Sequence, residues 1–205
     1  MSANEQAMSM SAVPLSLRGP APVRVVAGFG FWLFLLSDII LFAAFFATYA
    51  VLSGSTAAGP SIAELVDRRH VFLETLCLLA SSATCGFGLL AIHRTDVRGM
   101  YIWMGITFLL GACFLTMEGQ EFASMVASGA GPSRSAALSA FFALVGTHGL
   151  HVSLGLAWLA VMLLQVATLG FHPMVGRRFF CFSLFWHALD IVWIGVFTIV
   201  YLGAK

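Results

Sequence analysis

Residues Ser135–Tyr201 read SAALSAFFALVGTHGLHVSLGLAWLAVMLLQVATLGFHPMVGRRFFCFSLFWHALDIVWIGVFTIVY. The segment holds two apolar runs, and each is long enough to cross a lipid bilayer, which takes about 20 residues as a helix. Ionisable side chains nevertheless stand near the middle of both runs, His148 and His151 in the first and His187 and Asp190 in the second. A charged group at that depth costs about 3 kcal/mol or more unless it faces protein or water and has a partner. This hairpin is therefore predicted to carry the polar seam around which the other helices pack.

The composition of the whole chain indicates the same class of protein. Its 205 residues are 60% hydrophobic and only 9% charged, and its formal net charge is +1. A soluble domain of this length would carry far more charge on its surface. A nearly neutral chain also lacks the basic surface that nucleic acids require. We expect an all-α, multi-pass membrane protein with no nucleic-acid partner.

Apolar runs predict a bundle of five transmembrane helices, separated by connections rich in Gly, Pro and charged residues. The helices are expected near residues 29–52, 71–92, 100–126, 136–169 and 179–202. Residues 1–26 are rich in Ser, Ala and Pro, so they are predicted to form a flexible cytoplasmic tail. The remaining residues, 27–205, are predicted to form the transmembrane domain.

The distribution of basic residues predicts the orientation of the chain. The N-terminal tail and the second and fourth connections together hold six Arg residues, whereas the other connections and the C-terminus hold four basic residues. Because basic residues are enriched on the cytoplasmic side of membrane proteins, the N-terminus is expected inside. Five spans then place the C-terminus on the outer, periplasmic side.

Acidic residues within the first two spans suggest two different environments. Asp38 lies among Phe, Leu and Ile near the middle of its span. It must therefore stay protonated or find a partner on another helix or subunit. Proton handling and hydrogen-bonded packing both account for it. Glu74 lies about one turn inside the second span, where interfacial water is expected to solvate it.

Glu118 and Glu121 are three residues apart in the third span, so they share one face of the helix. Two carboxylates that close repel each other when both are ionised, so one is protonated or each has its own partner. Carboxylate pairs bind iron in helical bundles, but those sites need a Glu-x-x-His motif on two helices. Neither glutamate has a histidine three residues further on, so a metal site is not expected.

The histidines allow two interpretations. His148 and His151 are also three residues apart and are flanked by glycines, which let another helix come close. Two histidines on different helices, such as His151 and His187, could ligate a haem. Hydrogen bonding between helices is the alternative. A count of helical rise puts Asp38, His148, His151 and Asp190 at similar depth, so these side chains could form one network.

Several motifs together resemble those of subunit III of the haem-copper terminal oxidases. They are GFGFW at 28–32, LSDIILF at 36–42, ExxEF at 118–122, SAFFALVGTHGLHV at 139–152 and FWHALDIVW at 185–193. The amino-acid sequence around residues 45–52 and 131–152 is most similar to that of the cytochrome bo-type ubiquinol oxidase branch of the family. The resemblance implies a non-catalytic subunit of a proton-pumping respiratory complex with subunits I, II and IV, whose substrate is ubiquinol. Subunit I would carry the haems and copper, and this chain would stabilise it, its proton-uptake path and bound phospholipid.

The same resemblance implies that this chain has no catalytic, cofactor-binding or metal-binding residue of its own. Its polar residues at membrane depth would form a buried network and subunit contacts, namely Asp38, Glu118, Glu121, His148, His151, His187 and Asp190. A carboxyl linked to proton handling in longer family members corresponds to Asp38, although it is a glutamate there. Three other functions remain open: subunit III of a cytochrome c oxidase, a small membrane haem protein, and an ion or proton transporter. No inverted repeat, the usual sign of a transporter, is visible in the sequence.

Overall fold

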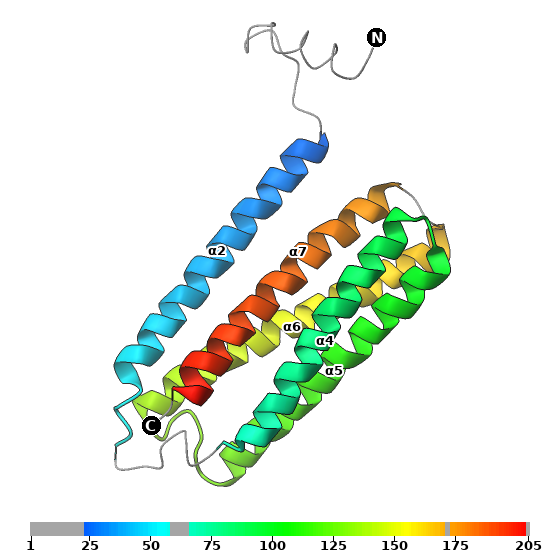
Figure 1. Cartoon of the computed structure of the whole chain (residues 1–205). Helices are drawn as coiled ribbons and strands as arrows, with labels where there is room; N and C mark the ends of the chain where they lie inside the picture. The colour runs from blue at the N-terminus through cyan, green and yellow to red at the C-terminus, as the bar shows by residue number, and fades with distance from the viewer. Residues whose placement is uncertain (1–22, 58–65, 171–172, 204–205) are drawn as a thin grey trace, which may run out of the picture. The chain divides into compact units, whose positions relative to one another are not determined.

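The computed structural model describes residues 23–57, 66–170 and 173–203, and every regular element within these ranges is helical. The elements are α2 (Val23–Leu52), α4 (Arg68–His93), α5 (Val97–Ala127), α6 (Ala136–Leu169), α7 (Pro173–Val196) and the π-helix η2 (Phe197–Leu202), drawn in Figure 1. Five helices, with η2 counted as the continuation of α7, are long and apolar enough to cross a membrane. The prediction of an all-α, five-helix membrane protein is confirmed.

The chain forms two compact units, and the boundary between them lies between Leu36 and Ser37, within α2. The first unit contributes the beginning of α2, where the rings of Phe31 and Phe34 lie one turn apart with centroids separated by 5.8 Å. The second unit contains the rest of α2 and the other helices. All contacts described below belong to the second unit.

Most helices begin a few residues before the apolar run that predicts them. α6 has the predicted bounds, whereas α7 begins at Pro173 rather than near residue 179. Side-chain caps explain the early start of two others, since Asp67 accepts a hydrogen bond from the Arg69 amide and Asp96 accepts one from the Gly99 amide. The predicted tail lies outside the described residues up to residue 22, and its last four residues open α2.

The second unit is built on helices that run side by side along most of their length. α4 packs against both α5 and α7, and α6 also packs against α5 and α7 (Figure 1). The indole of Trp186 on α7 fills the centre, where a Cβ atom added at Gly111 or at Gly155 would lie within about 3 Å of the ring. These two glycines let α5 and α6 approach the indole closely.

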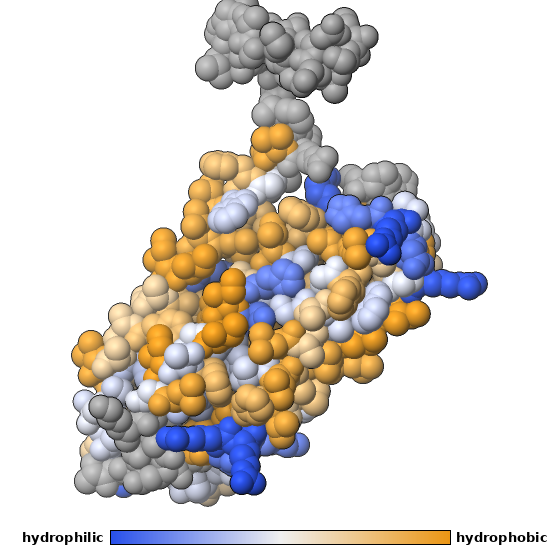
Figure 2. All heavy atoms as spheres, viewed as in Figure 1, coloured by the Kyte–Doolittle hydropathy of each residue, from blue (hydrophilic) through white to orange (hydrophobic). Residues whose placement is uncertain are grey.

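The surface of the second unit is apolar along the helices and polar at their ends. Figure 2 shows hydrophobic residues along the helices, hydrophilic residues gathered toward both ends, and a smaller hydrophilic patch in between. Ile40, Leu109 and Ile191 are each exposed by more than two thirds. Apolar side chains this exposed require lipid or another protein chain around them.

Candidate functional site

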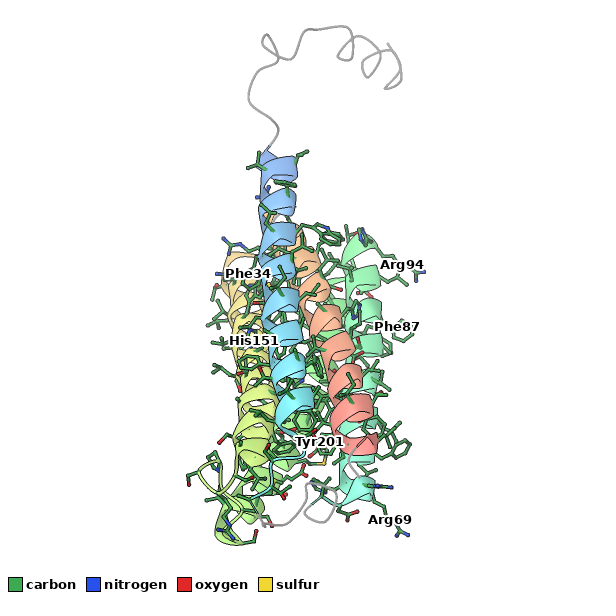
Figure 3. All side chains as sticks on the ribbon, turned by 90° about the vertical axis from the view of Figure 1, so that its left-hand side faces the viewer. Phe34, Arg69, Phe87, Arg94, His151 and Tyr201 are labelled. Atoms are coloured by element: carbon green, nitrogen blue, oxygen red, sulfur yellow. The ribbon has the colours of Figure 1, made fainter. Side chains whose placement is uncertain are left out.

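Asp38 and His151 form a polar pair about midway along the helices. Asp38 Oδ1 on α2 lies 3.7 Å from His151 Nε2 on α6, and both side chains keep less than a fifth of their surface exposed. Figure 3 places His151 between the end of the bundle marked by Arg94 and the opposite end marked by Arg69. The sequence predicts that Asp38 stays protonated or has a partner on another helix or subunit. In the structure, His151 on α6 is such a partner.

A second contact of His151 fixes which ring nitrogen carries a proton. Nδ1 lies 2.8 Å from the Thr147 carbonyl oxygen, which can only accept, so Nδ1 must donate its hydrogen to it. Nε2 is then left facing the Asp38 carboxyl. One proton shared between Nε2 and this carboxyl satisfies both groups, as a neutral pair or as an ion pair.

His148, one turn before His151, is fully buried among aromatic rings. Its ring stacks on Trp193 with centroids 5.1 Å apart, and the edges of Phe114 and Phe42 approach it at 5.9 Å and 6.3 Å. Neither of its nitrogens has a hydrogen-bond partner among the described residues. His148 thus contributes to the aromatic core and lies outside the pair formed by its neighbour.

His187 and Asp190 on α7 face α4 rather than the histidines of α6. The Ser82 hydroxyl and His187 Nδ1 form a hydrogen bond of 2.7 Å, in which either atom can be the donor. Asp190 is buried and lies within electrostatic reach of both Ser82 and His187. The structure thus brings Asp190 close to His187 of its own helix.

Further hydroxyl groups on α4 form hydrogen bonds with α7, and the sequence analysis did not predict them. The indole Nε1 of Trp186 donates to Ser81 Oγ at 3.1 Å, and that of Trp193 donates to Thr75 Oγ1 at 3.1 Å. Each of these hydroxyls donates in turn to a backbone carbonyl of its own helix. Their signal in the sequence is the recurrence of Ser and Thr inside a membrane-length helix, where such side chains join helices.

Glu118 and Glu121 gather with a third carboxylate that was expected elsewhere. Glu74 is fully buried, so the expectation that interfacial water solvates it was wrong. It lies against Glu118 and Glu121 of α5, close enough for all three to interact electrostatically. α4 turns this residue toward α5 instead of toward the surface. Hydropathy alone gives depth but not the direction in which a helix faces.

The polar residues at membrane depth therefore lie in three groups within the described part of the chain, with His148 apart from them in the aromatic core. Asp38 pairs with His151, the α7 residues bond to α4, and the glutamates cluster between α4 and α5. Within the ranges that the structure describes, no three His, Cys, Asp or Glu residues are arranged to hold a metal ion.

Each of the three histidines has its own contacts within the second unit. His151 already directs its two nitrogens at Thr147 and Asp38. His148 is enclosed by aromatic rings on several sides. His187 Nδ1 is likewise engaged, in the hydrogen bond with Ser82.

Comparisons with known proteins agree with the motifs. The model of the cytochrome c oxidase subunit III family matches residues 15–205. The chain is 53% identical over 174 residues to cytochrome bo(3) ubiquinol oxidase subunit 3 of Pseudomonas aeruginosa, covering 85% of this chain and 83% of that protein. It is 54% identical over 173 residues to the protein of that name from Pseudomonas putida, covering 84% of each. Cytochrome c oxidase subunit 3 of Bacillus sp. strain PS3 is 44% identical over 173 residues, again with 84% of each covered. The resemblance in the motifs is thus confirmed, and the chain belongs to the cytochrome c oxidase subunit III family.

Proposed function

We propose that this chain is the non-catalytic third subunit of a proton-pumping ubiquinol oxidase in the aerobic respiratory chain of a bacterial inner membrane. Relatives named as bo(3) ubiquinol oxidase subunit 3 share more than half of the aligned residues with it, over most of both chains. The haems and copper of the complex would lie in subunit I. This chain would stabilise subunit I and its proton-uptake path, with subunits II and IV as further partners.

The observation that supports a role in assembly is the exposed edge of the Asp38–His151 pair. Their side chains are still 18% and 16% exposed, although they lie midway along membrane-length helices. Lipid tails cannot hydrogen-bond such groups, so another protein chain is needed to cover them. Exposed Leu150 and Leu154 on the same helix supply an apolar surround. We propose this patch, centred on Asp38 and His151, as the surface that docks on subunit I.

Purification through a tag on this chain tests the docking surface. We expect a haem-bearing subunit to co-purify with the unchanged chain. His151→Ala and Asp38→Leu should each lower the yield of complex several-fold, while the haem spectrum of the complex that does form is unchanged. Ser153→Ala is the matched control on α6, because its hydroxyl donates only to the Gly149 carbonyl of its own helix. Full assembly of both variants would contradict the docking surface, and a haem bound to this chain alone would contradict the non-catalytic role.

The electron donor requires a separate measurement. Cytochrome c oxidase is the second candidate, because a relative with that name is 44% identical. The purified complex should reduce oxygen with ubiquinol and not with reduced cytochrome c. Turnover with cytochrome c alone would assign the chain to that second type of complex.

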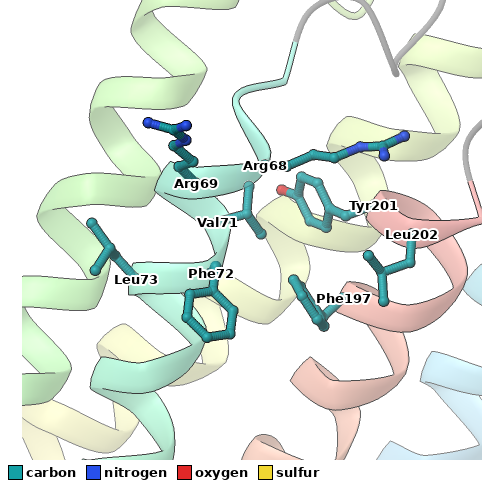
Figure 4. A pocket seen from close by; sticks show the side chains of 8 residues that line it. All are labelled: Arg68, Arg69, Val71, Phe72, Leu73, Phe197, Tyr201 and Leu202. Carbon is teal, nitrogen blue, oxygen red and sulfur yellow. The ribbon is translucent and has the colours of Figure 1, made fainter.

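Phospholipid is expected in an apolar cavity of about 530 Å³ between α4 and the end of η2. Figure 4 shows Arg68 and Arg69 at one end of this cavity, with Phe72, Phe197 and Leu202 along its wall. Guanidinium groups at the rim would hold a lipid phosphate, and the apolar wall would hold an acyl chain.

Native mass spectrometry of the complex tests this site. Replacing both arginines by Gln should remove one bound anionic phospholipid. The pair Arg94→Gln and Arg98→Gln, outside the cavity, is the control. An unchanged lipid count in the first variant would rule out the site.

A further inference from the structure

Three glutamates and a tyrosine meet at one end of the bundle, away from the Asp38–His151 pair. Glu74 comes from α4, Glu118 and Glu121 come from α5, and Tyr201 comes from η2. Glu74, Glu118 and Tyr201 are 0%, 4% and 3% exposed. In Figure 3, Tyr201 lies toward the end of the bundle where Arg69 stands. These four residues are called the acid site below.

The acid site contains seven buried oxygen atoms that have no hydrogen-bond partner in the described part of the chain. They are both carboxyl oxygens of each glutamate and the hydroxyl of Tyr201. Leaving one such group unsatisfied costs about 1 to 3 kcal/mol, so protein interiors rarely tolerate several together. Water molecules between these oxygens would remove most of that cost.

Charge repulsion limits how many of the glutamates can be ionised. The three carboxyls interact with one another electrostatically, and a low-dielectric surround strengthens repulsion between like charges. Opposite charge is available from His70, whose Nε2 lies 3.5 Å from Glu74 Oε1 and which also acts on Glu121. His70 and Arg68, which lies beside Tyr201, supply at most two positive charges for three carboxylates, so we expect the acid site to hold a proton.

Tyr201 provides an independent sign that the acid site has a ligand. Its hydroxyl is directed from η2 toward the first turn of α4 in Figure 4, and it interacts with all three glutamates. A buried phenol normally has a hydrogen-bond partner, and this one has none within residues 66–170 or 173–203. A bound water placed between the phenol and the carboxyls would satisfy both.

A cavity of about 260 Å³ opens at the surface and is lined by Glu121, which is the member of the acid site that it reaches. Asp67, His70, Gln120, Glu121 and Ser124 line it. Asp67 caps the beginning of α4, so the cavity reaches the end of the helices where bulk water is available. Its lining is polar enough to hold several waters, because each can contact more than one side-chain donor or acceptor.

We infer that Glu74, Glu118, Glu121 and Tyr201 form a hydrated proton-holding site that exchanges protons with the aqueous phase through this cavity. A hydronium ion in the cavity gives a proton to a carboxylate oxygen, so that an O–H bond forms there and water remains. The reverse step returns the proton to water. The exchange needs no haem or quinol and does not depend on the function proposed above.

The occupancy of the acid site should rise as the pH falls. The charged and titratable groups that face it are Asp67, Arg68 and His70 from the start of α4 and Tyr49 from α2, beside its own members. From α6, the ring of Phe141 packs at 5.9 Å from that of Tyr201 and adds no charge. No neighbour except His70 becomes positive on acidification, so protonation of the carboxyls is the main response.

Infrared difference spectroscopy of the purified oxidase tests the inference. The complex with the unchanged chain should show a protonated-carboxyl band that grows as the pH falls and shifts promptly in heavy water. Glu118→Gln should remove part of this band, and Tyr201→Phe should keep it at a shifted frequency. Asp96→Asn, an exposed acid at the opposite end of α4, is the control and should leave the band unchanged.

The contrary results are equally specific. A band that is identical in the unchanged complex and in Glu118→Gln at every pH would overturn the inference. So would a band that does not respond to heavy water, because it would indicate dry carboxyls that never exchange. If Glu118→Gln prevents co-purification of the complex, Glu121→Gln at the cavity takes its place and must lose part of the same band.

Discussion

His148 and His151 are one turn apart on α6, yet their rings have different surroundings. His151 faces a carboxyl and a carbonyl, whereas His148 faces three aromatic rings. The spacing in the sequence indicated that the two lie near one face, and the apolar neighbours indicated depth. It could not indicate which ring would meet Asp38, because that depends on the rotation of α2 relative to α6.

A double-mutant cycle on Asp38→Leu and His151→Leu measures the coupling of this pair. We expect each single change to lower the stability of the assembled complex by about 1 to 3 kcal/mol, since each leaves a polar group unsatisfied. The double variant should lose less than the sum of the two. Thermal unfolding of the purified complex gives the values, with Ser153→Ala as the reference change. Strict additivity would show that the two side chains do not interact.

At the scale of elements, α7 is joined to α4 by indole and imidazole groups that meet hydroxyls. The bonds from Trp186 to Ser81 and from Trp193 to Thr75 lie about two turns apart along α7, and the Ser82–His187 bond lies next to the first of them. Thr75 and Ser81 donate their hydroxyl hydrogens to carbonyls of their own helix, and their oxygens accept the hydrogen bonds from the indoles. The two helices are thereby held in one register.

Thr75→Val tests this register with almost no change in shape. The variant leaves the buried Nε1 of Trp193 without its acceptor, so stability should fall by about 1 to 3 kcal/mol. Thr168→Val is the control, because that exposed hydroxyl donates only to carbonyls of its own helix. The fraction of complex surviving a temperature ramp reports both. Equal survival of the two variants would show that the Trp193–Thr75 hydrogen bond does not stabilise the complex.

A pair of glycines on α5 tests how closely the helices approach. A methyl group at Gly111 would meet Leu156 and Trp186 at 3.0 Å, whereas one at Gly105 would meet no atom within 4 Å. Gly111→Ala should therefore cost about 1 to 3 kcal/mol through overpacking. Gly105→Ala should be neutral or slightly stabilising, because alanine favours the helix. Thermal unfolding of the two complexes distinguishes them, and similar midpoints would contradict the packing around Trp186.

The helices themselves were predictable because apolar length and punctuation act locally. Capped starts before the apolar runs and the π-turn at Phe197–Leu202 were not predicted, since neither changes the hydropathy of the segment. For the site, depth was predictable and partners were not. Glu74 illustrates the gap, because one turn of depth suggested water while the packing of α4 on α5 buried it completely.

For the whole molecule, the orientation in the membrane follows from charge at the ends of the bundle. Arg94 and Arg98 flank the turn between α4 and α5, and Arg134 lies in the connection before α6. The excess of arginines on the side of the first turn predicts that this turn is cytoplasmic. The connection before α6 would then face the periplasm.

Cysteine labelling in intact cells measures this orientation. A membrane-impermeant maleimide should label Ser133→Cys from outside, whereas Thr95→Cys should react only after the cells are opened. The four native cysteines all lie within helices, and the unchanged chain is the background control. Labelling of Thr95→Cys in intact cells would reverse the orientation.

The bonds between α4 and α7 also have a consequence for how the protein is made. Their partners are 105 residues apart for Ser81–Trp186 and Ser82–His187, and 118 apart for Thr75–Trp193. During synthesis the hydroxyls of α4 leave the ribosome long before the rings that will bond to them. Until α7 has been synthesised, the hydroxyls of α4 lack the side chains of α7 that bond to them. A chain truncated before α7 would keep these polar groups unpaired within the membrane, and we expect membrane proteases to degrade it.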